Sequence, residues 1–374
     1  MTSPYSRRKS FPESHVWANI RTLHHPISFL LELTARCNMN CRHCYVNCPS
    51  TDTAVAAREM PRAMVADLAR QAVDMGTLWC TLTGGDPLLH PEFTDIYLDL
   101  KRLGLLTSVF TNATLITTEH AQLWQAYPPR DVEVTVYGAT AESYERVTRR
   151  PGSYAAFRRG LDILGEYGVP VHLKAIALRS NYDDLANIAE FCRQYSKDRV
   201  RFSTMLHLRT DGDQQRSAEI RAERLTAAEM RASAQAFDDD DCLEPGKKQP
   251  AITAADDPMQ LFHCNAGIGN FAISYDGQFR LCISLNAPGT TYDLHKGTLR
   301  DAWENFVPAV RALRTTADFR CTGCDIRHQC TTCPAFAYLE TGALDGVPEY
   351  FCQLAHEKDI TPRFSPHPSP HLAK

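Results

Sequence analysis

At residues 34–45 the chain reads Thr34-Ala35-Arg36-Cys37-Asn38-Met39-Asn40-Cys41-Arg42-His43-Cys44-Tyr45. Cys37, Cys41 and Cys44 follow the spacing C-x3-C-x2-C, and the imidazole of His43 directly precedes the third cysteine. Three soft thiolates on one short loop can hold three irons of an iron–sulfur cube and leave the fourth iron open for a second molecule. Zinc normally takes a fourth protein ligand at finger-like spacing, and a chance cluster of structural thiols is the remaining alternative. The stretch therefore predicts an iron–sulfur loop with an open iron.

Composition limits the partners and the compartment. The 374 residues include 40 Lys plus Arg and 44 Asp plus Glu, a formal net charge of -4, which gives no basic footprint for nucleic acid. No apolar run is long enough to span a membrane, and the basic start at residues 1–10 lacks the apolar segment of a signal peptide. Fourteen cysteines without an export signal favour metal ligation over disulfides. We expect a cytoplasmic metalloprotein that binds neither nucleic acid nor membrane.

Predicted strands and helices alternate through the first 200 residues. Apolar runs rich in Val, Ile, Leu and Thr are typical of parallel strands buried on both faces, and they lie at 27–34, 78–83, 107–110, 131–137, 169–177 and 200–205. Periodic segments between them predict helices at 61–75, 92–103, 154–167 and 183–195. Six strand–helix units indicate an α/β fold with a parallel sheet and right-handed crossovers, too few for a complete eight-fold barrel.

Two motifs are expected on the same rim of this sheet. The cysteine loop follows the first strand, and Gly84-Gly85-Asp86-Pro87 follows the second. The chemistry of barrels lies at the carboxyl ends of the strands, and two glycines let the backbone approach a ligand closely. Taken alone, the same four residues would also suit a plain strand-to-helix turn.

The pattern loosens after about residue 210. Residues 219–237 predict one helix, and the four aspartates at 238–241 and the segment 246–250 are typical of a solvated linker. The proline-rich end at 362–371 is typical of a disordered tail.

Seven further cysteines follow the order C…G-x4-C…C-x2-C-x5-C-x2-C…C, with Gly277 as the glycine. They are Cys264, Cys282, Cys321, Cys324, Cys330, Cys333 and Cys352. Paired C-x2-C spacings are usual for zinc, so these residues on their own leave a zinc ribbon open.

Together the two cysteine patterns and the Gly-Gly-Asp-Pro motif resemble the radical S-adenosylmethionine (SAM) superfamily with a C-terminal SPASM extension. The resemblance implies a partial (β/α)6 TIM-type barrel at 26–210, preceded by an extension at 1–25. A helix and linker would follow at 211–262, a cysteine-rich SPASM domain at 263–356, and a disordered tail at 357–374. It also implies that Cys37, Cys41 and Cys44 ligate a [4Fe-4S] cluster whose fourth iron is chelated by SAM.

The same resemblance implies contacts to SAM. His43 would lie near the adenine, Thr135 would meet the ribose, and Arg146 would clamp the carboxylate. Ammonium recognition would fall to the backbone and the acid of Gly84, Gly85 and Asp86. Three plain alternatives remain: a surface-loop histidine, a simple strand threonine, and a neighbouring arginine in place of Arg146.

In the C-terminal part the resemblance implies one or two auxiliary iron–sulfur clusters. One would be held by Cys321, Cys324, Cys330 and Cys352, and the other by Cys264, Cys282 and Cys333. Asn270 stands where sulfatase-maturing relatives carry another cysteine, so the fourth iron of the second cluster would be open or bound by Cys242 or His263, or the cluster would be smaller. We interpret Cys48, Cys80 and Cys192 as buried thiols.

The family resemblance implies an enzyme that cleaves SAM to a 5′-deoxyadenosyl radical and abstracts hydrogen from a substrate. Maturation of a ribosomal peptide, by crosslinking or oxidation, is the first expectation. The sulfatase-maturing type is disfavoured because Ile283 replaces the aspartate that follows the cysteine. The implied electron donor is of the flavodoxin or ferredoxin type. Because few residues precede the first strand, either a separate leader-peptide recognition protein presents the peptide or the substrate has no leader. The alternatives are oxidation, decarboxylation or epimerisation of a sugar or nucleoside and, more distantly, a non-enzymatic metal-binding adaptor.

Overall fold

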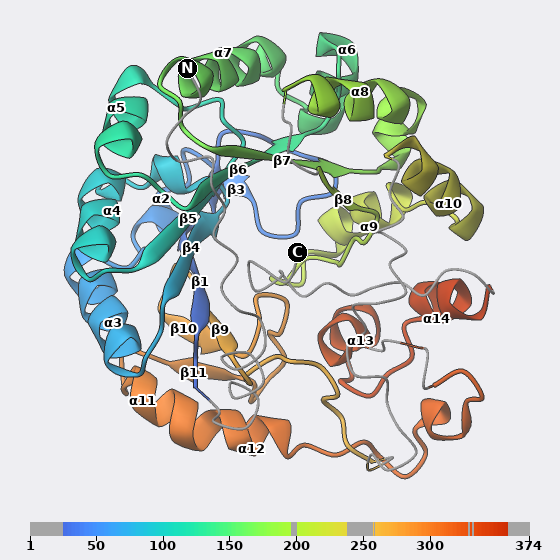
Figure 1. Cartoon of the computed structure of the whole chain (residues 1–374). Helices are drawn as coiled ribbons and strands as arrows, with labels where there is room; N and C mark the ends of the chain where they lie inside the picture. The colour runs from blue at the N-terminus through green and yellow to red at the C-terminus, as the bar shows by residue number, and fades with distance from the viewer. Residues whose placement is uncertain are drawn as a thin grey trace, which may run out of the picture.

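A nine-stranded sheet forms the centre of this computed structural model, in the order β11-β10-β9-β1-β4-β5-β6-β7-β8 (Figure 1). The structure describes residues 25–195, 200–237, 257, 259–327, 330 and 333–357. The predicted extension at 1–24, the aspartates at 238–241, Cys242 and the tail after 357 lie outside the described residues.

Six of the strands run parallel to one another and are consecutive in the barrel. They are β1 (Ser28–Thr34), β4 (Trp79–Gly84), β5 (Leu106–Thr111), β6 (Asp131–Val136), β7 (Val171–Ile176) and β8 (Arg201–Ser203). The predicted partial (β/α)6 barrel is therefore confirmed, although β7 and β8 are shorter than the apolar runs that predicted them.

Helices lie along the outer side of these strands in Figure 1. They are α3 (Arg62–Asp74), α4 (Phe93–Arg102), α5 (Thr118–Ala126), α6 (Ala141–Thr148), α7 (Ser153–Glu166) and α8 (Leu185–Tyr195). The sequence analysis predicted four of the six and missed α5 and α6. Both missed helices begin at a threonine cap, Thr117 and Thr140, whose hydroxyl accepts from a backbone N–H.

The single helix predicted at 219–237 is wrong, because the chain forms two helices there. These are α9 (Gln214–Ala222) and α10 (Ala227–Ala236). Thr226 starts the second helix as its N-cap and forms a capping box with Glu229. Between the helices Arg224 turns inward, where it bonds the carbonyl of Leu206 at 3.0 Å and pairs with Glu340.

The C-terminal part shares the sheet of the barrel. Strand β9 (Asn270–Ile273) pairs parallel with β1, and β10 (Gln278–Arg280) and β11 (Thr291–Asp293) continue antiparallel. Later helices are α11 (Leu299–Asp301), α12 (Val307–Arg311), α13 (Pro334–Thr341) and α14 (Glu349–His356), with a π-helical turn at Ala302–Phe306 and a 3-10 turn at Arg320–Gly323. Within the described part of the chain, every helix is too short or too polar to cross a membrane.

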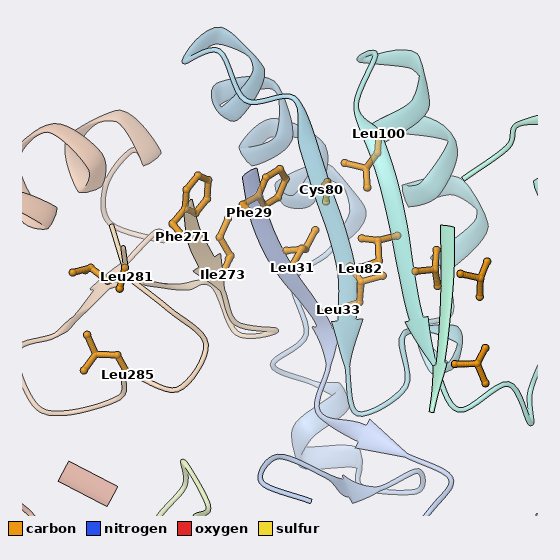
Figure 2. Packing of buried hydrophobic residues seen from close by; sticks show 14 of the residues in the cluster. Phe29, Leu31, Leu33, Cys80, Leu82, Leu100, Phe271, Ile273, Leu281 and Leu285 are labelled. Carbon is orange, nitrogen blue, oxygen red and sulfur yellow. The ribbon is translucent and has the colours of Figure 1, made fainter. Parts of the chain in front are cut away.

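Alternation along β1 separates two environments. Phe29, Leu31 and Leu33 pack with Cys80 and Leu82 in the main core between the sheet and its helices (Figure 2). Successive side chains of a strand point to opposite faces, so the residues between them, Leu30 and Glu32, face the inside of the barrel. This inward face carries the polar side chains that a substrate can meet.

Candidate functional site

The cysteine loop follows β1 at the carboxyl edge of the sheet. Cys37 lies in the short strand β2 (Arg36–Cys37), which pairs with β3 (Cys48–Pro49). The backbone N–H groups of Asn40 and Arg42 donate to the carbonyls of Thr148 and Val147 at 3.0 and 3.1 Å, so the loop is fixed to the end of α6. The thiols of Cys37 and Cys41 are buried.

The three thiols are close enough to influence one another. Burial, followed by neighbouring charges that include Cys44, raises the pKa values of Cys37 and Cys41 well above their usual range. N–H groups nevertheless point at the sulfurs: Met39 N lies 3.4 Å from Cys37 Sγ, and Asn47 N lies 3.4 Å from Cys44 Sγ. Such donors stabilise thiolates, and a bound metal supplies the charge that removes the protons. The loop thus fits a metal centre.

His43 and Tyr137 form an aromatic pair beside the thiols. Their ring centroids are 5.3 Å apart, and Nδ1 of His43 is buried without a hydrogen-bond partner among the described residues. Burial lowers the pKa of His43 to about 3, so the ring is neutral. Tyr137 also donates a hydrogen bond toward Cys41, which opposes the rise of that thiol's pKa. The sequence analysis did not select Tyr137, although it directly follows β6 at the expected edge.

Gly84 and Gly85 lie against the first strand. The N–H of Gly85 donates to the carbonyl oxygen of Thr34 at 2.8 Å. A Cβ atom added to Gly84 would lie only 2.1 Å from that same oxygen. A Cβ on Gly85 would lie 2.3 Å from the carbonyl oxygen of Arg36. The two glycines therefore allow two loops to touch, a reason that differs from the expected approach to a ligand.

Asp86 is fully buried and already holds three donors. Its carboxylate accepts from Leu88 N at 3.0 Å, Thr111 Oγ1 at 2.8 Å and Asn112 N at 3.0 Å. Burial raises its pKa to about 6, and these hydrogen bonds oppose the rise. The acid thus joins the loops after β4 and β5, a role that the sequence analysis did not foresee, and the backbone carbonyls remain the groups available to an ammonium ion.

Asn112 connects this junction to the thiols. Its Nδ2 lies 3.7 Å from Cys37 Sγ and 2.9 Å from Asn38 Oδ1. The next residue, Ala113, has a φ of 65°, in the left-handed region that favours glycine. Asn112 is a further residue beside the thiols, and the sequence analysis assigned it no contact.

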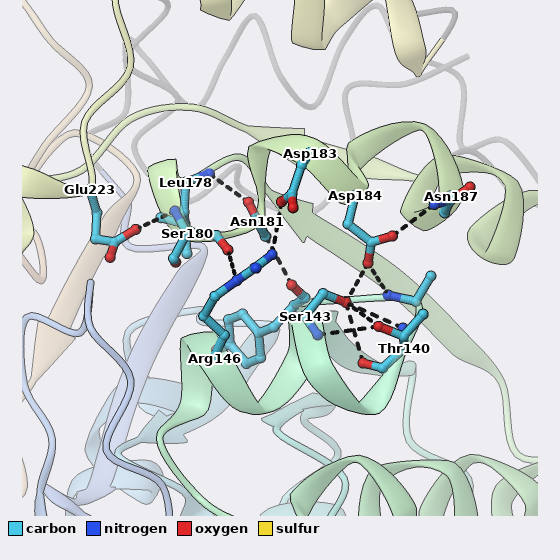
Figure 3. A network of polar contacts seen from close by, with 12 residues as sticks. Thr140, Ser143, Arg146, Leu178, Ser180, Asn181, Asp183, Asp184, Asn187 and Glu223 are labelled. Carbon is cyan, nitrogen blue, oxygen red and sulfur yellow. Dashed lines mark hydrogen bonds and ion pairs between the residues drawn. The ribbon is translucent and has the colours of Figure 1, made fainter.

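Thr135 and Arg146 lie on neighbouring elements. Thr135 is half-buried in β6, on the face opposite the buried Val134. Arg146 donates through Nε to the carbonyl of Ser180 at 2.6 Å and pairs with Asp183 at 2.8 Å, as Figure 3 shows. Its guanidinium is therefore held at the surface by the segment before α8, and a carboxylate ligand would have to compete with Asp183.

Two arginines after β8 hold the cysteine loop from the other side. Arg216 donates to the carbonyl of Cys41 at 2.9 Å, and the buried Arg209 donates to the carbonyl of Asn47 at 3.0 Å while also pairing with Asp211. No spacing in the sequence predicts this contact, because about 170 residues separate the partners in the chain.

Two groups of thiols gather in the C-terminal part. Burial, followed by the charge of Cys264, raises the pKa of Cys282 to about 11. Burial, followed by the charges of Cys282 and Cys264, also raises the pKa of Cys333. Burial, followed by Cys330, Cys352 and Cys324, raises the pKa of Cys321 to about 11. Cys330 and Cys333 thus lie near different groups, in the interleaved arrangement that the resemblance implies.

The surroundings of the first group bear on its fourth ligand. Asn270 Oδ1 is buried without a hydrogen-bond partner among the described residues, and His263 has interactions of its own. In the second group, His356 Nε2 lies 3.7 Å from Cys324 Sγ. Nowhere in the described ranges do three or more His, Cys, Asp or Glu side chains converge closely enough to hold a single metal ion.

Comparisons with known proteins find a family match over part of the chain. Residues 31–192 match the model described as the radical SAM superfamily. The AdoMet-dependent heme synthase of Methanosarcina barkeri is 23% identical over 338 residues, covering 83% of this chain and 92% of that protein. The PqqA peptide cyclase of Xanthomonas euvesicatoria pv. vesicatoria is 26% identical over 317 residues, covering 81% of each chain. SuiB of Streptococcus suis, bound to its precursor peptide SuiA, has the same fold, with a TM-score of 0.65, 16% identity, and coverage of 90% of this chain and 78% of that one.

Proposed function

Since the chain is an enzyme of the radical SAM superfamily, we propose that Cys37, Cys41 and Cys44 hold its cluster and that its substrate is a ribosomal peptide. The domain implies SAM and a [4Fe-4S] cluster as cofactors. Held by these three thiols, the cluster would supply the one-electron reduction that cleaves SAM, and a substrate carbon would lose a hydrogen atom to the 5′-deoxyadenosyl group. The membership sets aside the non-enzymatic adaptor that the sequence left open.

The observation that carries the cluster assignment is the gathering of three thiols at the carboxyl end of β1. Two of them are buried, N–H groups point at the sulfurs, and the loop is bonded to α6 and to Arg216. A loop fixed on both sides holds its ligands in place before the metal binds, which reduces the cost of ordering them.

The remaining SAM contacts are proposed from the same rim. The neutral ring of His43, packed on Tyr137, would take the adenine, and Thr135 on β6 would meet the ribose. Carbonyls of Gly84 and Gly85 would accept from the ammonium group. Asp86 would act by fixing those carbonyls, and Arg146 would meet the carboxylate after leaving Asp183.

We further propose two auxiliary iron–sulfur sites. Cys321, Cys324, Cys330 and Cys352 would hold one cluster, and Cys264, Cys282 and Cys333 the other. The second would keep one position open for substrate, because Asn270 stands in place of a cysteine there and its amide oxygen has no hydrogen-bond partner in the part of the chain that the structure describes. Such clusters would accept the second electron of an oxidation and would receive electrons from, or return them to, a flavodoxin- or ferredoxin-type protein.

A peptide substrate is supported by the relatives that span the chain. PqqA peptide cyclase matches 81% of it, and the SuiB complex holds a precursor peptide in the same fold. A separate protein would present the leader of the peptide, and the reduced thiols suit a cytoplasmic setting. A small-molecule substrate is the second candidate, because the heme synthase matches 83% of the chain. A sugar or nucleoside would belong to this second class.

The test begins with anaerobic purification and reconstitution. About twelve irons per chain, four for each of three cubane clusters, are expected, with little zinc. Reduced enzyme and SAM should then yield 5′-deoxyadenosine, and short peptides encoded beside the gene should lose two hydrogens per new bond by mass spectrometry. Zinc in the C-terminal part, or turnover of small molecules with every peptide unchanged, would contradict the proposal.

A further inference from the structure

Glu32 is a buried carboxylate that the proposed cofactor sites do not use. It lies in β1, is 2% exposed, and its Oε1 has no hydrogen-bond partner among the described residues. A buried acceptor without a partner costs free energy, so native structures rarely keep one without a use. Because Glu32 faces the inside of the barrel, that use is to be sought among groups that enter from there.

Arg280 carries a buried hydrogen-bond donor on the same inward face of the sheet. In the sheet, Leu30 of β1 pairs with Ala272 of β9, and Ala272 pairs with Arg280 of β10. Paired residues share a face, so Arg280 points inward like Leu30 and, two residues on, Glu32. The Nε of Arg280 is also buried without a hydrogen-bond partner among the described residues.

The two groups attract each other from a distance. The spacing of the strands and the rise per residue put their Cα atoms roughly 12 Å apart. Burial raises the pKa of Glu32 to about 7, and the positive charge of Arg280 opposes that rise. The charge of Asp276 also raises the pKa of Glu32, and the charge of Glu32 in turn raises the pKa of Tyr45. A buried acceptor and a buried donor, neither with a hydrogen-bond partner in the described ranges, thus lie on the same wall of the barrel.

The neighbours suit a peptide. Leu30, Ala272 and Ile283 form a small apolar cluster, with Tyr45 of the cysteine loop packed against it. Glu32 lies five residues before Cys37, and Arg280 lies two residues before Cys282. A group held here would lie between the two thiol groups that we propose to bind clusters.

We propose that Glu32 and Arg280 hold one peptide unit of the substrate: the carboxylate accepts its N–H, and Nε–H of the guanidinium donates to its C=O. A peptide unit is the common group that offers one donor and one acceptor at fixed spacing. This inference rests on the proposed peptide substrate and adds the residues that select it.

The experiment measures binding to the reconstituted enzyme with SAM bound and without reductant. The probe is a pool of N-acetyl-amino-acid N-methylamides covering all common side chains, observed by saturation-transfer NMR. A matched pool with both amide nitrogens methylated lacks the N–H donors. We expect a subset of the first pool to bind and the methylated pool not to bind. Glu32→Ala and Arg280→Ala should each weaken binding about tenfold.

Control variants test whether the proposed clamp, formed by Glu32 and Arg280 around one peptide unit, acts by specific contact rather than through general charge or folding. Asp276→Asn removes a carboxylate that acts on Glu32 only through space, and it should leave probe binding unchanged. Glu32→Gln keeps an acceptor and should lose less than Glu32→Ala. Melting temperature and cluster absorbance establish that each variant is folded and loaded.

Equal binding of the pool to wild type and Glu32→Ala, equal binding of the methylated pool, or no binding at all would overturn the clamp. Formation of 5′-deoxyadenosine and mass changes of candidate peptides are measured separately. A protein that modifies peptides but fails the binding test refutes the clamp alone, whereas one that cleaves no SAM refutes the proposed function.

Discussion

The cysteine loop at 37–44 and the cysteine segment at 321–330 both bring thiols together, but by different means. The first is bonded to α6 through Asn40 and Arg42 and is held from the far side by Arg216. In the second, the 3-10 turn at Arg320–Gly323 has no buried residue, and the backbone bonds are local turns such as Cys324 N to the Cys321 carbonyl at 3.2 Å. The fold therefore shapes the first site before metal binds, whereas in the second site the metal would do much of the shaping.

The largest expected effect is on chemistry at the first site. Replacing Cys37, Cys41 and Cys44 together by alanine should abolish 5′-deoxyadenosine formation, because no ligand would remain for the proposed cluster. About eight of twelve irons should stay bound in the C-terminal part. Liquid chromatography of the nucleoside and iron analysis measure the two outcomes. Cys48→Ala, in the same loop, is the matched control and should keep both SAM cleavage and iron, and SAM cleavage by the triple variant would refute the cluster assignment.

Removal of iron should act more strongly on the structure of the second site. Treatment with a chelator under reducing conditions should leave hydrogen exchange in β1 and β4 slow. Residues 319–327 should lose nearly all protection, because the backbone bonds described there are turns between near neighbours, such as Cys324 N to the Cys321 carbonyl. Exchange followed by mass spectrometry compares the two regions. Equal loss of protection at 35–48 and 319–327 would show that the first loop also depends on metal.

The same contrast explains what the sequence could predict. The strand runs and the three-cysteine spacing are local patterns, so they located the barrel and the first thiols directly. The assignment of Arg216 to the Cys41 carbonyl and the pairing of β9 with β1 depend on tertiary packing, which no local spacing records. The role of Asp86 was missed for the same reason, since its three donors come partly from another loop.

A buried ion pair joins the two helices after the barrel to the C-terminal part. Arg224, between α9 and α10, pairs with Glu340 of α13 and stacks over the ring of Tyr350 at 4.6 Å. Arg224→Met should destabilise the protein by about 3 kcal/mol, because the largely buried Glu340 would keep only its longer contact to Arg221, at 3.5 Å. Thermal unfolding measures the loss. Arg224→Met combined with Glu340→Leu should recover most of it, and no recovery would show that stacking on the ring matters more than charge.

The buried Glu32 on the inward face of β1 predicts that the free energy of unfolding depends on pH by about 3 kcal/mol. Burial raises the pKa of Glu32 to about 7 in the folded protein, from an ordinary value of 4.5. The folded state therefore binds the proton more tightly, and this contribution to stability is full below pH 4.5 and is lost as pH rises through 7. Glu32→Gln should remove that slope, so the variant should gain on wild type between pH 5 and 8 in denaturant titrations. Parallel curves would place the carboxylate in water.

The smallest effect concerns the junction beside the first thiols. Ala113 has a φ of 65°, which costs a residue with a Cβ about 1 kcal/mol. Ala113→Gly should therefore stabilise the protein by about 0.5 kcal/mol, the relief of strain slightly exceeding the added freedom of the unfolded chain. Ala121→Gly makes the same chemical change inside α5, where the backbone is helical, and should destabilise by about 1 kcal/mol. Changes of opposite sign in the free energy of unfolding would show that the backbone at Ala113 is strained. The contacts of Asn112 to Asp86 and Cys37 would hold the loop in that shape, as expected of a site shaped before metal binds.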